Sequence, residues 1–291
     1  MSTDTYLPFL PATRVPRRPL PSGACDCHFH VFEDVRRYPL GTVRGYTPTP
    51  APLAEYRKML NVLGVERAIL VHPSVYGRDH STFEDTLRVC AGWMRGVAVV
   101  YEDTPQEDIA RWHDLGARGA RCNALFSGGA SLSQMGAIAD RVRDLGWHLQ
   151  LLVDVGADPD IVSKIADFGL PVVVDHFGHL PAGGALQSKG FQNLLSLVRE
   201  GRAWVKMSGA YRVSEQRSRY TDVAPLAEAL LKANGSQLVW GSDWPHPSIA
   251  APMADDTDIL DALADWLSPE QWVNVLADNP RRLYWADSAA A

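Results

Sequence analysis

Histidines and one aspartate stand at the ends of apolar runs in this chain, where side chains of these types can activate water. His28 and His30 close the first run, and His176 closes a run that contains three consecutive valines. Asp243 follows another apolar run that ends at Gly241. A carboxylate can take a proton from water, and an imidazole can donate to a carbonyl oxygen or bind a metal ion. This set of residue types is typical of a hydrolytic site.

Other apolar runs also end in polar residues. His72 ends the second run, Arg121 and Asn123 end the fourth, and Lys206 lies near the end of the seventh. Structural roles are open for several of these positions: His176 as a hydrogen-bonded core histidine, for example, or Lys206 as the partner of a buried acid. Because so many polar groups share one type of position, we favour a functional reading for the set.

The elements that must position these residues alternate between short apolar runs and segments of helical period. The expected strands are 24–31, 67–72, 96–101, 119–123, 147–154, 171–176, 203–208 and 237–241. The expected helices are 53–63, 83–92, 105–115, 132–145, 159–168, 191–199, 224–233 and 257–266, with a last helix near 269–277. Eight strand–helix pairs predict an α/β fold of the (β/α)8 barrel type, in which strand ends form the active site.

A doubly wound parallel sheet is the alternative architecture. It normally has fewer strands, and a glycine-rich turn often follows the first one. Here His-Val-Phe-Glu-Asp follows the first strand, and the chain contains neither G-x-G-x-x-G nor a P-loop. Residues 1–23, with five prolines, predict an extended arm, and residues 24–291 predict a single barrel. The long loop 32–52 is expected to cover the barrel mouth.

Composition excludes several classes of protein. The chain has 291 residues, a net charge of −6, 46% hydrophobic residues and 21% charged residues. The acidic balance argues against nucleic acid or an anionic membrane as a partner. No apolar run approaches the roughly 20 residues of a membrane span. Four cysteines in a chain of this length do not form a disulfide framework, so we expect reduced thiols and a cytoplasmic protein. An oligomer is left open.

Three motifs together carry a resemblance to a known family. They are Asp26-x-His28-x-His30, the run Val174-Asp175-His176-Phe-Gly178, and Trp240-Gly-Ser-Asp243-Trp-Pro-His-Pro247. The chain resembles the amidohydrolase superfamily, in the branch of 2-pyrone-4,6-dicarboxylate lactonase and sulfomuconolactone hydrolase. The resemblance extends from about residue 23 to residue 285. It implies a (β/α)8 barrel that hydrolyses a ring lactone, in aromatic or sugar-acid catabolism.

The resemblance also implies roles for individual residues. Asp243 matches the general base, and His28, His30 and His176 would surround the carbonyl oxygen. Arg121 and Arg212 match arginines that bind the carboxylate of the substrate, a task suited to the planar guanidinium. The strand-end residues His72 and Asn123 are included as further substrate-binding residues.

Two positions depart from the lactonase pattern. The loop 124–129 has no basic residue, and Leu152 stands where the lactonase has a tyrosine. The expected substrate is therefore a small anionic lactone whose identity stays open, carboxylated or sulfonated. Alternatives are an aldarolactone isomerase, a metal-dependent decarboxylase of the same superfamily and a non-catalytic binding barrel.

The metal requirement follows from which ligands are present. Many amidohydrolases use a Lys or Glu on the fourth strand and a His on the fifth, and neither stands here at the expected place. His28, His30 and Asp243 remain as ligands, and three ligands can hold a catalytic zinc. We expect an enzyme that requires no cofactor, with one Zn²⁺ as the alternative.

Overall fold

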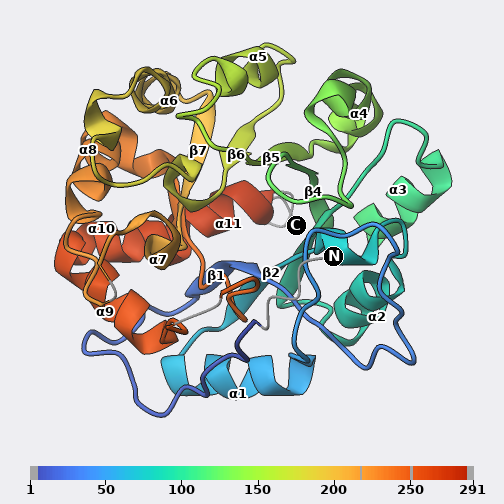
Figure 1. Ribbon diagram of the computed structural model, residues 1–291, viewed down its shortest axis with the longest axis horizontal. Coiled ribbons are helices and arrows are strands. Elements are labelled where there is room, and N and C mark those ends of the chain that lie inside the picture. The colour runs from blue at the N-terminus through green and yellow to red at the C-terminus, as the bar shows by residue number, and fades with distance from the viewer. Residues whose placement is uncertain (1–5, 217, 250–251, 287–291) are drawn as a thin grey trace.

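The computed structural model describes residues 6–216, 218–249 and 252–286. Eight parallel strands follow one another in chain order around a barrel, with helices outside them (Figure 1). The strands are β1 Cys25–Phe29, β2 Arg67–Val71, β3 Met94–Ala98, β4 Ala117–Asn123, β5 His148–Leu152, β6 Val172–Val174, β7 Ala203–Met207 and β8 Leu238–Trp240. The predicted (β/α)8 architecture is confirmed. The observed strands are mostly shorter than predicted, because several polar residues at their ends already belong to the loops.

Most of the helices form a ring around the strands (Figure 1). They are α1 Leu53–Leu63, α2 Ser81–Val89, α3 Gln106–Asp114, α4 Met135–Val142, α5 Ile161–Ala166, α6 Lys189–Arg199, α7 Ala210–Val213, α8 Ala224–Asn234, α9 Asp256–Trp266, α10 Pro269–Val273 and α11 Asn279–Tyr284. The short helix α7 was not expected. It lies directly after β7 and brings two side chains to the barrel mouth.

The barrel closes between β8 and β1 through the residues that follow β8. The amide of Asp243 donates to the carbonyl of His28 at 2.8 Å, and the amide of His30 donates to Trp244 at 2.8 Å. Gly241 permits this approach, because a Cβ there would lie 2.7 Å from the backbone nitrogen of His28. The backbone therefore fixes Asp243 beside both histidines of β1.

The register of β1 shifts between Asp26 and Phe29. Both of these residues contact Tyr56 of α1: its hydroxyl donates to Asp26 at 2.9 Å, and its ring stacks on Phe29 at 3.7 Å. Cys27 belongs to the apolar cluster inside the barrel, while the ring of His28 meets those of His30 and His176. The irregularity thus lets two consecutive residues of β1 face the interior.

The lower end of the barrel is filled by side chains. Tyr284 and Trp285 of the C-terminal segment join the interior cluster of valines and cysteines. The ring of His148 lies 5.3 Å from that of Tyr284 and occupies the space over Gly119, where a Cβ would lie 2.4 Å from it. His148 therefore packs at the end opposite the mouth, where its role is structural.

The described part of the N-terminal arm, residues 6–23, contains no helix or strand. Arg14 and Arg17 bind Asp261 of α9, at 2.7 Å from Arg14 Nη1 and 2.8 Å from the amide of Arg17. The amide of Leu7 donates to Ile249 in the loop after β8. The arm therefore crosses α9 and reaches the segment that carries Asp243. No helix among the described residues has the length and hydropathy needed to cross a membrane.

Candidate active site

A pocket opens at the carboxyl ends of the strands. Its wall combines charged, imidazole and apolar side chains from the strand ends and the loops. The lining residues are His30, Tyr46, Ser74, Arg121, Asn123, Phe126, Leu152, His176, His179, Arg212, Asp243, Pro247 and Ser248. Tyr46 comes from the long loop after β1, which was predicted to cover the mouth. This end of a (β/α)8 barrel is where active sites lie.

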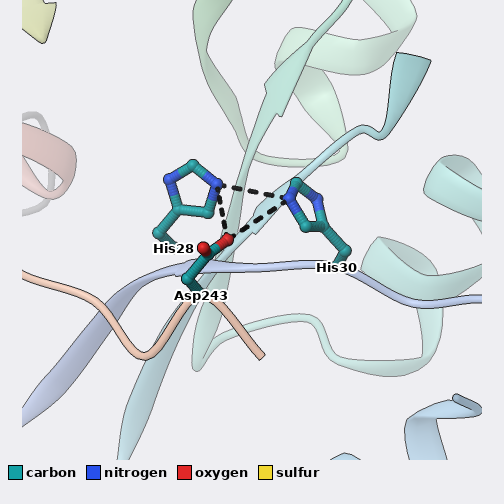
Figure 2. Close-up of side chains that lie close together, drawn as sticks. All are labelled: His28, His30 and Asp243. Atoms are coloured by element: carbon teal, nitrogen blue, oxygen red, sulfur yellow. Dashed lines mark hydrogen bonds and ion pairs between the residues drawn. The ribbon is translucent and has the colours of Figure 1, made fainter. Parts of the chain in front are cut away.

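Asp243 is the buried carboxylate of this pocket, with 1% of its surface exposed. Its Oδ2 accepts hydrogen bonds from Tyr211 Oη and Arg212 Nε, both at 2.6 Å. Its Oδ1 faces the Nε2 atoms of His28 at 3.7 Å and His30 at 3.9 Å (Figure 2). Oδ1 is therefore the oxygen that can accept a proton from a bound molecule.

The same neighbours set the ionisation of Asp243. Burial alone would raise the pKa of Asp243, but Arg212, then His176 and His28, outweigh it and hold that pKa well below its usual range. The residue also has a φ of 64°, a left-handed conformation that aspartate tolerates better than most residues. Asp243 is thus an ionised carboxylate, held in position through the oxygen that does not face His28 and His30.

His28 and His30 present their Nε2 atoms to each other at 3.3 Å (Figure 2). His30 Nδ1 lies 2.7 Å from the carbonyl of Val71, so Nδ1 carries the proton. His28 Nδ1 lies 3.2 Å from Asp175 Oδ1, which favours a proton there too. Burial lowers the pKa of both imidazoles. In these tautomers two lone pairs therefore point into one space, where they could act as ligands of a cation.

His176 follows β6 and completes the imidazole group. Its Nδ1 lies 2.9 Å from Ser208 Oγ, and its Nε2 lies 3.7 Å from Asp243 Oδ2. A serine hydroxyl can donate as well as accept, so His176 is able to carry its proton on Nε2, facing the pocket. Burial lowers the pKa of this imidazole well below its usual value. A neutral His176 is therefore a hydrogen-bond donor at the mouth.

A layer of buried polar side chains lies beneath the pocket. Lys206 Nζ donates to Gln150 Oε1 at 2.8 Å and lies 3.5 Å from Asp175 Oδ1. Gln150 Nε2 donates to Asp175 Oδ2 at 3.1 Å, and Arg121 Nη2 lies 3.6 Å from the same oxygen. These cations, with His28, overcome burial and keep the pKa of Asp175 well below its usual value. The layer holds Asp175 ionised beside His28.

The predicted substrate-binding residues differ in their position relative to the pocket. Arg121 and Asn123 line the pocket, as expected. Arg212 lines it too, but its Nε is bound to Asp243 and its Nη2 donates to the carbonyl of Pro247 at 3.1 Å. His72 lies outside the pocket wall, because its ring stacks on His80 at 4.2 Å and meets Phe83 at 5.5 Å.

Tyr211 was missed in the sequence, although it precedes Arg212. Its hydroxyl donates to Asp243 and lies 3.1 Å from His246 Nδ1. His246 Nε2 in turn lies 3.2 Å from Asp256 Oδ1 on α9. His246 thus ties the loop after β8 to Tyr211 and to α9. The sequence signal was a Tyr-Arg pair a few residues after a strand end.

The geometry of His28, His30 and Asp243 suits a divalent metal ion. One ligand atom from each residue lies within 4.8 Å of the others. Ligand atoms about 2.1 Å from a tetrahedral zinc stand about 3.4 Å apart, close to the 3.3 Å between the two Nε2 atoms. The surroundings oppose a cation, however: Arg212 is bound to Asp243, and Lys206 Nζ lies 3.4 Å from His28 Nδ1.

Asp175 and His176 form a second group with His28 whose ligand atoms lie within 4.8 Å of one another. The amide of Gln150 is bound to Lys206 and Asp175. His176 faces the other carboxylate oxygen of Asp243. The residues present can therefore hold a metal through three side chains, in a region that already contains two protein cations.

The chain is similar to known proteins over most of its length. The family model described as amidohydrolase matches residues 25–285. A 4-sulfomuconolactone hydrolase of Hydrogenophaga intermedia is 32% identical over 272 residues, covering 91% of this chain and 89% of the relative. A 2-pyrone-4,6-dicarboxylate hydrolase of Comamonas testosteroni is 30% identical over 285 residues, covering 94% of this chain and 93% of the relative.

The fold also matches a solved structure. A Pseudomonas putida protein, assigned as a 2-pyrone-4,6-dicarboxylic acid hydrolase, superimposes with a TM-score of 0.79 and 32% sequence identity. The match covers 91% of this chain and 98% of the other. The similarity therefore extends over nearly the whole barrel.

Proposed function

This chain belongs to the amidohydrolase family, and from that premise we propose that it hydrolyses the ring ester of a small carboxylated lactone. The observation that carries the proposal is that the two carboxylate oxygens of Asp243 have different contacts. One carboxylate oxygen is held by Tyr211 and Arg212, and the other faces the histidine pair in an enclosed pocket. Two relatives that are 30–32% identical over most of the chain are named as hydrolases of such compounds.

Asp243 acts as the general base in this proposal. A water molecule near Oδ1 lies between the carboxylate and the histidine pair and gives its proton to that oxygen as it attacks the lactone carbonyl. The held Oδ2 keeps the carboxylate from rotating away. Because its pKa is low, Asp243 is already ionised before substrate binds. It can therefore accept the proton of the attacking water without first losing a proton of its own. A positioned base of this kind contributes about 10²–10⁴-fold to a rate.

An imidazole stabilises the negative charge that develops on the carbonyl oxygen. His176 carries an Nε2 proton when Ser208 donates to Nδ1, so His176 is the donor to the carbonyl oxygen. Preorganised donors of this kind lower a barrier by about 2.7–4 kcal/mol each. When the tetrahedral intermediate collapses, the ring C–O bond breaks, and Asp243 returns its proton to the leaving oxygen. The product is the open hydroxy acid or its keto form.

The reaction in this proposal does not require a metal. A bound Zn²⁺, held by His28, His30 and Asp243, would supply Lewis-acid polarisation of the carbonyl. Arg212 and Lys206 already place positive charge beside two of those three ligands, which weakens the attraction for a cation. In this mechanism the Nε2 proton of His176 stabilises the charge that develops on the carbonyl oxygen.

Product analysis in H₂¹⁸O tests the proposed reaction. Hydrolysis places one ¹⁸O atom in the new carboxylate of the product, whereas isomerisation of a lactone incorporates none. A panel of carboxylated and sulfonated lactones, each assayed by mass spectrometry, would identify a substrate. Turnover of a lactone without incorporation of ¹⁸O would replace hydrolysis by isomerisation. Loss of carbon dioxide would indicate a decarboxylase.

A further inference from the structure

Arg121 has hydrogen-bonding capacity that the protein does not use. Its side chain is buried in the pocket wall, and its Nε has no hydrogen-bond partner. Its nearest carboxylate, Asp175, lies 3.6 Å from Nη2 and is shared with Lys206 and His28. A buried guanidinium whose N–H groups lack acceptors is suited to bind an anionic oxygen of a ligand.

Arg212, the other arginine of the described pocket wall, has its charge compensated. It forms an ion pair with Asp243 at 2.6 Å and also donates to the carbonyl of Pro247. Because Asp243 neutralises the charge of Arg212, this arginine is not available to pair with a second anionic group of a ligand. The pocket therefore offers one arginine whose charge is available to substrate.

The part of the wall formed by Tyr46, Phe126 and Leu152 is uncharged. Leu152 ends β5 and is 3% exposed, and the rings of Tyr46 and Phe126 meet edge-on at 5.6 Å. Burial raises the pKa of the Tyr46 phenol, so it stays neutral. An anionic substituent against these three side chains would lose its hydration without a cation among them to pair with, which is costly.

This apolar wall is held in place by Asn123. Its Oδ1 accepts hydrogen bonds from the amides of Leu125 at 3.0 Å and Phe126 at 2.9 Å, and its Nδ2 donates to Ser74. Gly45 packs so closely that a Cβ there would lie 3.1 Å from Phe126. The loop that carries Phe126 is thus braced on two sides. Asn123 positions the wall rather than offering its oxygen to substrate.

We propose that the substrate is a lactone with a single anionic group, bound by Arg121, and an uncharged substituent lying against Tyr46, Phe126 and Leu152. This inference rests on the proposed lactone hydrolysis and narrows its substrate class. It separates this chain from relatives named for a dicarboxylate or for a sulfonated muconolactone. Phe126 and Leu152 are the residues that determine this specificity.

The test compares two lactones that differ in one substituent. Both have the same six-membered ring and one carboxylate; the first has a methyl group at the second position and the second has another carboxylate. We expect kcat/KM to be at least about tenfold higher for the methyl compound, the scale of one charged hydrogen bond. Equal or faster turnover of the dicarboxylate would overturn the inference.

A substitution in the wall should reverse this preference. Phe126→Arg adds a cation beside the second substituent, so it should favour the dicarboxylate by about tenfold or more relative to the wild type. Leu125→Arg is the matched control, because Leu125 is adjacent in sequence, 36% exposed and outside the lining of the pocket. It makes the same change in net charge and should leave the preference as in the wild type. A Phe126→Arg variant that keeps the wild-type preference would contradict the assigned wall.

Binding of unreactive analogues separates this inference from the proposed reaction. The two matching tetrahydropyran carboxylates lack the ester, and calorimetry measures their affinity for the wild-type protein without turnover. Tighter binding of the monoacid without hydrolysis of either lactone would support the charge preference and refute the reaction. Tighter or equal binding of the diacid would refute the charge preference, whatever the lactones do.

Discussion

Arg212 Nε lies 2.6 Å from Asp243 Oδ2, so an arginine expected to bind substrate is joined to the proposed base. Tyr211, the residue before it, donates to the same oxygen. Both side chains come from the short helix α7, directly after β7. Asp243 therefore depends on a neighbouring loop for its orientation and for its low pKa.

This contact predicts an effect on the acid limb of the pH–rate profile. A carboxyl group whose pKa is lowered in the folded protein acts as a base at every pH above that pKa. Its activity as a base is lost as the pH falls through the lowered pKa, because the group becomes protonated. In the wild type, Asp243 becomes protonated only at a pH well below its ordinary pKa of 3.8. Arg212→Met removes the largest opposing charge and leaves burial, so the limb should move to higher pH. The profile of kcat/KM measures this.

The control for that profile is an arginine outside the pocket. Arg202 binds Asp167 at 2.6 Å and its side chain is 42% exposed. Arg202→Met should leave the acid limb where the wild type has it. An unchanged limb in Arg212→Met, measured on a folded variant, would show that this arginine does not set the pKa of Asp243.

Arg121 should affect substrate affinity more than the chemistry. Arg121→Met removes the anion-binding group, so kcat/KM should fall, mostly through a higher KM. The expected fall corresponds to a loss of about 1.5–3 kcal/mol of transition-state stabilisation. Arg212→Met should also lower kcat/KM by at least that amount, but mostly through kcat, because it disturbs the base. Steady-state kinetics with the best lactone measure both. Wild-type kinetics in Arg121→Met would remove Arg121 from the substrate site.

Metal removal tests the role of His28 and His30. We expect that protein dialysed against a strong chelator, with its metal content measured by mass spectrometry, keeps its turnover. The physical reason is the positive charge of Arg212 and Lys206 beside the ligand atoms. Stoichiometric zinc whose removal abolishes turnover, and whose return restores it, would show the opposite.

Lys206 should be important for stability. Its Nζ is fully buried against Gln150 and Asp175, so Lys206→Met leaves a buried carboxylate with fewer compensating charges. The free energy of unfolding should fall by about 3 kcal/mol or more, as when one member of a buried pair is removed. Urea denaturation measures the change.

The matched control for Lys206 is Lys189, which binds Asp160 with 68% of its side chain exposed. Lys189→Met should change stability by less than about 0.5 kcal/mol. If Lys206→Met were as stable as the wild type, the buried layer would not need this cation.

The barrel could be predicted from the sequence because its signals are local. Each strand is a short apolar run, each helix has its own period, and parallel strands bring their carboxyl ends to one rim. This reasoning placed His28, His30, His176 and Asp243 together without any contact being known. It also placed the long loop after β1 over the mouth, where Tyr46 now lies.

The direction of individual side chains was not predictable in the same way. His72 follows Val71, whose side chain faces the interior, so the alternation along the strand turns His72 outward to His80. The register shift in β1 and the path of the loop that brings Tyr211 to Asp243 depend on packing between distant segments. No periodic pattern in the sequence encodes such contacts.

The most direct test of the account is the rate of lactone hydrolysis by Asp243→Asn, compared with the wild type. Asparagine keeps the size of the side chain and removes the base, and thermal unfolding of the variant checks that the fold is retained. We predict that kcat falls by about 10²–10⁴-fold, the contribution of a positioned base. Hydrolysis by the folded Asp243→Asn variant at the wild-type rate would contradict the assignment of Asp243 as the base.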